Sequence, residues 1–286
     1  LMSDDLRMHS GVANQSKELV MGTIKQYDWV QVGAAIKHPE AGKVIDMNQA
    51  VRDSMGIKDA YLKIYPMDGY GNQQILREIM KIEKPDAIMH FTDPRFWIWL
   101  YQMEHEVRQK IPIMYLNIWD DLPDPWYNTN YYRSCDLLMS ISKQTYGINK
   151  RVLDGCGYED WQMVYTPHGI NEKIYHKVEK GDTHFKQFEA KFGLDEYKFK
   201  VLYLNRNIRR KQPGDVVLAY KHFVDGLSEE QQKECCLVFH TQISDDNGTD
   251  LKAVCDRFIP EYNVIFTHEN NINGFNDEDK NFMYNS

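Results

Sequence analysis

Apolar residues along the chain fall into two kinds of segment that alternate with one another. Short, nearly continuous apolar runs at residues 30–36, 87–91 and 112–118 have the length and composition of buried parallel strands. Residues 72–82 instead place apolar side chains three or four positions apart, which predicts a helix with Asn72 as its N-cap. Strands separated by helices of this length are typical of βαβ units, so we predict an α/β protein with parallel sheets.

This alternation is interrupted between about residues 167 and 198, where charged residues and glycines replace the apolar runs. We interpret the stretch as a crossing between domains, followed by a helix over residues 183–192 that ends at Gly193. A second α/β region then contains three strand-like runs, at residues 201–204, 237–240 and 264–266.

Length and composition restrict the class of protein. The 286 residues suffice for two domains, which we place at residues 1–170 and 171–286. A net charge of −8 disfavours a general nucleic-acid binder, which needs a dominant basic surface. The five cysteines, an odd number with no C-x-x-C pair, predict reduced thiols rather than a zinc site. Reduced thiols indicate a cytoplasmic protein. The apolar runs are too short to span a membrane, and peripheral membrane contact stays open.

The clearest sign of chemistry is a basic loop between a predicted strand and a predicted helix. The apolar run 201–204 is followed by Arg206 and Lys211, with two more arginines between them, and a helical pattern begins near Asp215. In an open α/β sheet, ligands bind beyond the carboxyl ends of the strands, where loops meet helix N-termini. Cations at such a position suit a diphosphate. A solvated surface loop is the alternative interpretation of this segment.

The basic loop resembles the G-R-x-x-x-x-K-G donor-phosphate loop of retaining GT-B glycosyltransferases of the family 4 (glycosyl transferases group 1) type. Asn205 and Gln212 stand where that family has glycines. Four other segments are similar to motifs of the family and follow in its order, at residues 3–13, 86–94, 136–143 and 164–170. The similarity covers nearly the whole chain. It implies two Rossmann-like domains in a GT-B-like fold, the first binding the acceptor and the second the nucleotide-sugar donor.

The resemblance also implies an activity. It is that of a retaining glycosyltransferase, which moves a sugar from a nucleotide-diphospho-sugar to an acceptor that is a glycan, a lipid or a protein. Arg206 and Lys211 would stabilise the charge on the leaving nucleoside diphosphate, so neither a metal ion nor a cofactor is expected. Gly11 would let the backbone approach the donor phosphates at a helix N-terminus. An ordinary strand-to-helix turn is the alternative for Gly11.

His90 and Asp93 are the candidate catalytic residues. They follow a predicted strand, and the resemblance matches them to a histidine and an acidic residue near the transferred sugar. Matching Asp93 to the glutamate of the family's H-x-H-E-P form, however, puts Thr92 at the functional histidine and His90 at the first one. A structural histidine bonded to a backbone carbonyl is therefore the alternative for His90.

A loop rich in aspartates and tryptophans supplies candidate acceptor-binding residues. Trp119, Asp120 and Trp126 follow the strand predicted at residues 112–118. Aromatic faces beside carboxylates suit a sugar or another acceptor. The alternative is a loop packed by its own aromatic side chains.

The C-terminal segment bears on completeness. Residues 277–286 resemble the helix that precedes the family's acidic E-x7-E donor motif, and that motif is not in the chain. We therefore expect a fragment with an incomplete second domain, weak or no activity, and a homodimer or aggregate formed through uncovered apolar faces. Two alternative functions stay open: a nucleotide-sugar epimerase of GT-B architecture, and a non-catalytic α/β binding module.

Overall fold

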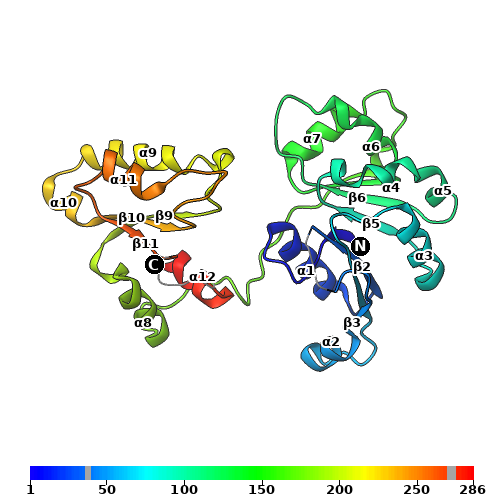
Figure 1. Cartoon of the computed structure of the whole chain (residues 1–286), viewed down its shortest axis with the longest axis horizontal. Helices are drawn as coiled ribbons and strands as arrows, with labels where there is room; N and C mark the ends of the chain where they lie inside the picture. The colour runs from blue at the N-terminus through cyan, green and yellow to red at the C-terminus, as the bar shows by residue number, and fades with distance from the viewer. Residues whose placement is uncertain (36–39, 269–274) are drawn as a thin grey trace. The chain divides into compact units, whose positions relative to one another are not determined.

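The computed structural model describes residues 1–35, 40–268 and 275–286. They form two compact units, Leu1–Gly169 and Ile170–Ser286, called here the N-terminal and the C-terminal unit (Figure 1). Each unit has a sheet of mainly or entirely parallel strands with helices packed against it. The α/β class predicted from the alternation of apolar runs and helical stripes is confirmed.

An eight-stranded sheet forms the centre of the described part of the N-terminal unit, in the order β3-β4-β2-β1-β5-β6-β7-β8. The strands are β1 (Met2–Asp4), β2 (Trp29–Ala34), β3 (Ile45–Asp46), β4 (Leu62–Pro66), β5 (Ile88–Phe91), β6 (Ile113–Asn117), β7 (Leu137–Ser140) and β8 (Met163–Tyr165). Only β3 runs antiparallel to its neighbour among these pairs. The order reverses at β1, where Met2 lies opposite both Val32 and His90. The loops after β1 and β5 therefore flank the topological switch point, where open α/β sheets bind ligands.

The helices of this unit include the one predicted at residues 72–82 from its apolar spacing. They are α1 (Gly11–Thr23), α2 (Asn48–Met55), α3 (Gln73–Glu83), α4 (Ile98–Gln102), α5 (Glu104–Arg108), α6 (Thr129–Arg133) and α7 (Lys143–Val152). Asn72 caps α3 as predicted, because its side chain accepts the backbone N–H of Ile75 at 3.1 Å. Pro94 begins a short 3-10 turn, Pro94–Trp97, that leads into α4.

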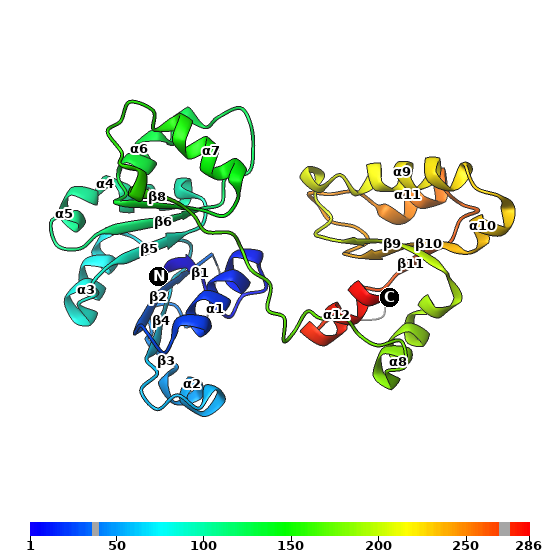
Figure 2. The same ribbon diagram turned by 180° about the vertical axis from the view of Figure 1, so that it is seen from behind.

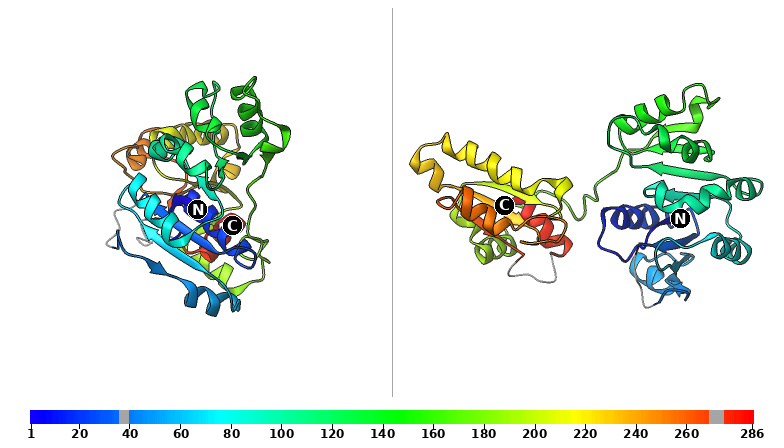
Figure 3. Two further views of the ribbon diagram at one scale, coloured as in Figure 1. Left: turned by 90° about the vertical axis from the view of Figure 1, so that its right-hand side faces the viewer. Right: turned by 45° about the horizontal axis from the view of Figure 1, so that its top comes forward.

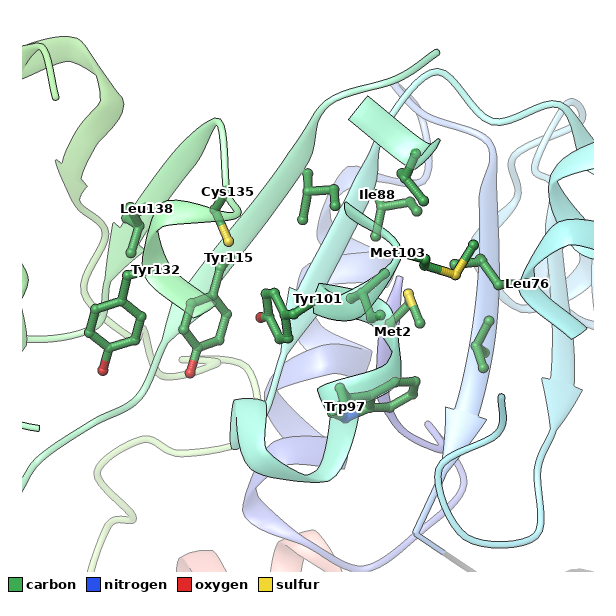
Figure 4. Packing of buried hydrophobic residues seen from close by; sticks show 14 of the residues in the cluster. Met2, Leu76, Ile88, Trp97, Tyr101, Met103, Tyr115, Tyr132, Cys135 and Leu138 are labelled. Atoms are coloured by element: carbon green, nitrogen blue, oxygen red, sulfur yellow. The ribbon is translucent and has the colours of Figure 1, made fainter. Parts of the chain in front are cut away.

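Apolar side chains cover both faces of the large sheet. On one face, large rings dominate: Trp97, Tyr115 and Tyr132 are almost completely buried, and Tyr101 packs beside them (Figure 4). The other face packs against α1 and α2 through smaller side chains such as Val20. Full burial of an aliphatic side chain contributes about 1.5–3 kcal/mol, so the two layers account for much of the stability of this unit.

The C-terminal unit has a three-stranded parallel sheet in the order β11-β10-β9, within the residues that the structure describes. It consists of β9 (Phe199–Leu204), β10 (Cys235–His240), β11 (Val264–Phe266), α8 (Thr183–Phe192), α9 (Pro213–Asp225), α10 (Glu229–Lys233), α11 (Leu251–Phe258) and α12 (Asp277–Asn285). Helices α9 and α11 cover one face of this sheet, and α8 and α12 cover the other (Figures 2 and 3). All three predicted strands are present, two of them beginning two residues earlier than predicted.

Two local features complete the fold. Helix α8 ends at Gly193, as predicted. The φ of Gly193 is 66°, the left-handed conformation that is common in a glycine at the end of a helix. Within the described residues, we find no helix with both the length and the apolar character needed to cross a membrane.

Candidate functional site

The loop after β1 leads directly into α1. Ser10 caps this helix: its Oγ accepts the N–H of Ala13 at 3.0 Å and donates to the Asp4 carboxylate at 2.6 Å. Burial raises the pKa of Asp4, and the hydrogen bond from Ser10 opposes that rise. Gly11 is the first residue of the helix, as expected, and it is exposed. A Cβ at Gly11 would meet no atom within 4 Å, so packing within this unit does not require glycine there.

Arg7, in the same loop, is a charged residue that the sequence analysis missed. Its guanidinium donates two hydrogen bonds to Asp5, at 2.9 and 2.7 Å, and one to Glu40 at 2.7 Å. These carboxylates raise the pKa of Arg7, and the hydrogen bonding of its guanidinium to Asp5 contributes most. The charge of Arg7 is therefore balanced inside the protein, and its partner Glu40 lies too far along the chain to be recognised from spacing.

His90, at the end of β5, is completely buried. Its Nδ1 lies 2.6 Å from the Tyr101 hydroxyl, and its ring stacks on Tyr115 with centroids 4.9 Å apart. Burial lowers the pKa of His90 to about 3, although the nearby charge of Asp93 opposes this, so the imidazole is neutral at pH 7. Since no part of the ring is exposed, it could contact a substrate only after the aromatic cluster opened. The geometry fits the structural alternative, with a tyrosine hydroxyl in place of the backbone carbonyl.

Asp93 and Trp119 are brought together by the side chain of Arg95. The Arg95 Nε donates to Asp93 Oδ1 at 2.9 Å, and the guanidinium carbon lies 5.3 Å from the centre of the Trp119 ring. Burial alone would raise the pKa of Asp93, but the hydrogen bonds from Arg95 outweigh it and lower that pKa. Asp93 is thus ionised and paired at neutral pH, and Arg95 is a second residue of this site that sequence reasoning missed.

Exposed aromatic rings continue from Trp119 along the same sheet edge. Trp119 packs edge-to-face on Tyr127 with centroids 5.8 Å apart, and Phe96 stacks on Tyr70 at 4.7 Å. The rings of Trp126, Tyr127 and Phe96 are 60, 63 and 53% exposed. We call Phe96, Trp119, Trp126 and Tyr127 the aromatic rim. Asp120 follows Trp119 with an exposed side chain, while its backbone carbonyl accepts a hydrogen bond from Gln144.

The basic loop, residues 205–212, lies where it was predicted, between the carboxyl end of β9 and the N-terminus of α9. The Arg206 side chain is 66% exposed, and its Nε lies 3.3 Å from Asp245 Oδ2. Lys211 ends a short 3-10 turn and is partly exposed. Gln212 follows with φ 46°, a conformation that glycine adopts with less strain.

Asp245 belongs to a second loop, residues 241–250, between β10 and α11, which we call the platform loop. It holds the basic loop through Asn207, a completely buried residue that the sequence analysis also missed. The bonded partners of Asn207 lie 35, 36 and 42 positions further along the chain, so no local pattern marks this residue.

Within residues 1–35, 40–268 and 275–286, no group of three or more His, Cys, Asp or Glu side chains is arranged to hold a metal ion.

Comparison with known proteins identifies the architecture. No family model and no curated protein matches the sequence. Among solved structures, trehalose-6-phosphate synthase OtsA aligns with a TM-score of 0.63 at 12% identity, over 96% of this chain and 72% of that one. The fold is that of GT-B glycosyltransferases. The predicted fold class, two Rossmann-like units of GT-B type, is confirmed.

Two further solved structures of this GT-B fold contain nucleotides. Anabaena Alr3699/HepE, in complex with UDP and glucose, aligns with a TM-score of 0.59 at 11% identity, over 91% of this chain and 66% of that chain. The E. coli trehalose-6-phosphate protein bound with UDP-2-fluoro glucose aligns with a TM-score of 0.61 at 12% identity, over 92% of this chain and 72% of that one. The chain therefore spans about two thirds of the length of the Anabaena protein.

Proposed function

We propose that this GT-B chain is part of a glycosyltransferase that takes its sugar from a nucleotide-diphospho-sugar. The observation that carries the proposal is the pair of cations, Arg206 and Lys211, beyond the carboxyl end of β9 and beside the start of α9. Proteins of the same fold were solved with UDP and with a UDP-sugar analogue, and UDP is the group that leaves when such a sugar is transferred. Cations at the end of a parallel strand suit that diphosphate.

The two cations would act on the departing diphosphate. Breaking the bond between the sugar and the phosphate leaves negative charge on the phosphate oxygens, and fixed positive groups stabilise that charge most when they need not reorganise. Arg206 and Lys211 would supply this stabilisation without a divalent metal ion. A retaining reaction, in which the leaving phosphate takes the proton of the acceptor hydroxyl, belongs to the same proposal.

The acceptor would bind to the N-terminal unit. Phe96, Trp126 and Tyr127 of the aromatic rim are more than half exposed and offer apolar surface to sugar C–H groups. The exposed Asp120 can accept hydrogen bonds from hydroxyls. Asp93 would act as an ionised acceptor held by Arg95. Gly11 keeps its proposed role of admitting a phosphate to the start of α1. His90 stays a catalytic candidate on the condition that the aromatic cluster that buries it opens.

Calorimetric titration with UDP, GDP and ADP, and with their sugar conjugates, tests the donor site. We expect one nucleoside diphosphate to bind, and Arg206→Ala and Lys211→Ala each to weaken that binding. Arg210→Ala is the matched control, because it removes the same charge from an exposed position in the same loop.

Two results would overturn the donor-site proposal. One is that none of the three nucleoside diphosphates binds at millimolar concentration. The other is that Arg206→Ala and Lys211→Ala bind the nucleotide as tightly as the Arg210→Ala control. Turnover is assayed separately, as release of UDP, GDP or ADP from its sugar conjugate in the presence of a panel of glycan acceptors.

A further inference from the structure

An amide side chain is buried between two surface loops of the C-terminal unit. The Asn207 Nδ2 lies within hydrogen-bonding distance of three carbonyl oxygens of the platform loop, those of Gln242 at 3.1 Å, Ile243 at 3.2 Å and Thr249 at 2.7 Å. Its Oδ1 accepts the N–H of Thr249 at 3.2 Å. The opposite amide orientation would place the Asn207 side-chain oxygen against three carbonyl oxygens, which cannot donate a hydrogen bond. The platform loop therefore determines the orientation of the Asn207 amide.

Gly248 allows the two loops to touch. A Cβ at this position would stand 2.2 Å from the backbone oxygen of Asn207 and 2.4 Å from its Oδ1. Contacts that short require the backbone itself to move, because the nearest atom is a carbonyl oxygen and not the end of a flexible side chain. Glycine is therefore needed at 248 for reasons of space, and the need comes from Asn207.

Other bonds fix the basic loop on both sides of Asn207. The N–H of Arg209 donates to the carbonyl of Asn247 at 3.0 Å, and the Tyr203 hydroxyl donates to the carbonyl of Arg206 at 3.2 Å. The Arg206 guanidinium itself remains largely exposed, with its Nε against Asp245. A long, exposed cationic side chain is thus carried on a backbone that is bonded at several points.

We propose that Asn207, seated against Gly248, is a positioning residue that holds Arg206 ready for a nucleoside diphosphate. The inference rests on the proposed function of the basic loop. Asn207 is buried and does not itself contact the ligand. It fixes the backbone from which Arg206 extends, so that the loop is ordered before the diphosphate arrives. Ordering a site in advance raises affinity, because binding then loses less conformational freedom.

The test is the affinity of Asn207→Ala and Gly248→Ala for UDP, GDP and ADP, measured by calorimetry on the whole chain. Both variants should bind the preferred nucleotide about tenfold more weakly than the wild type, or weaker still. Thermal unfolding is measured on the same samples, so that titrations are made only where each variant is folded. Hydrogen exchange of residues 205–212 should be faster in both variants before nucleotide is added.

Asn263→Ala is the matched control in the same unit. The Asn263 side chain also donates to backbone carbonyls, those of Lys233 at 3.4 Å and Cys235 at 3.0 Å, but it precedes β11 at the opposite end of the sheet. It should lower the unfolding temperature and leave nucleotide affinity within about twofold of the wild type. This control separates nucleotide affinity from stability. If Asn207 had a purely structural role, affinity would fall in each variant in proportion to its loss of stability.

The possible outcomes distinguish failure of the positioning role of Asn207 from failure of the proposed nucleotide-sugar function. Weakened binding in Asn207→Ala and Gly248→Ala, with Asn263→Ala unchanged, supports the positioning role. Unchanged binding in a folded Asn207→Ala overturns it, as does a loss of affinity that follows stability equally in all three variants. If the wild type binds no nucleoside diphosphate, the proposed function itself fails, even where hydrogen exchange shows that Asn207 orders the loop.

Discussion

The arginines at the two sheet edges differ in how their charge is used. In the N-terminal unit, Arg7 is held by Asp5 and Glu40, and Arg95 is held by Asp93. In the C-terminal unit, the side chain of Arg206 is 66% exposed and contacts one carboxylate among the described residues, that of Asp245, at 3.3 Å. Arg206 is more exposed than Arg7 (29%) and Arg95 (51%) and lies further from its carboxylate, so its guanidinium is more available to an anion. The contrast is consistent with the proposed function, in which the C-terminal unit binds a diphosphate and the N-terminal unit binds the acceptor.

The largest effect should come from removing the exposed arginine. Arg206→Ala should lower the rate of sugar transfer by about 10²–10³-fold, or about 2.7–4 kcal/mol, comparable to the loss of one fixed donor to a developing anion. The measurement is nucleotide release from the preferred sugar conjugate. Arg210→Ala serves as the control, and equal rates in the two variants would contradict the prediction.

Removing a carboxylate partner from Arg7 in the N-terminal unit should make this arginine resemble the less tightly paired Arg206. Asp5 is 1% exposed, so Asp5→Asn leaves Arg7 with Glu40 as its remaining carboxylate partner among those described above. We expect a loss of about 2–3 kcal/mol of unfolding free energy, less than for a fully buried pair because Arg7 is partly exposed. Arg7 should also gain affinity for inorganic phosphate. Denaturant unfolding and a phosphate titration measure both effects.

The exposed pair between Arg77 and Glu106 provides the comparison for Asp5→Asn. Both side chains are about 40% exposed, so Glu106→Gln should change stability little. Similar destabilisation by the two substitutions would show that burial does not set the strength of these pairs.

Acid should weaken the N-terminal unit from its interior. The pKa of His90 falls from its ordinary value of 6.5 to about 3 in the folded protein, so the unfolded chain binds the proton more readily. Stability from His90 is therefore full above pH 6.5 and is lost as the pH falls toward 3, by about 2 kcal/mol at pH 5. Between pH 7 and pH 5, the free energy of unfolding should fall less in His90→Phe than in the wild type.

The smallest effect should come from removing the carboxylate partner of Arg206, which increases the difference between this arginine and those of the N-terminal unit. Asp245→Asn removes the carboxylate that competes with a diphosphate for the guanidinium, so nucleotide affinity should rise, by roughly two- to fivefold. Asp246→Asn changes the same charge at an exposed neighbour and is the control. Weaker binding in Asp245→Asn would mean that this carboxylate orients Arg206 more than it competes.

Local patterns predicted the elements of the fold well, for a physical reason. Buried parallel strands need continuous apolar runs and helix ends need particular caps, so β5, β6 and α3 were recognisable from neighbouring residues alone. The two-residue strand β3 has too few positions to show a pattern, and no such signal predicted it.

The environments of the site residues could not be predicted in this way. The position of His90 at a strand end was apparent, but its burial depends on Tyr101 and Tyr115, which reach it from α4 and β6. The pairing of Arg7 with Glu40 joins residues 33 positions apart, and Asn207 bonds to Thr249 across 42. Sequence spacing locates a charged side chain on an element, whereas its partners depend on which loops the fold brings together.

The close fit of Gly248 against Asn207 has a consequence for protein engineering. A basic loop transplanted alone from another protein of this fold would meet a platform loop shaped for a different residue, so its cations would extend from a displaced backbone. Residues 205–212 and 241–250 should therefore be exchanged together in chimeras that aim to change nucleotide preference. The two segments act as one structural unit, although about thirty residues of helix and strand separate them in the chain.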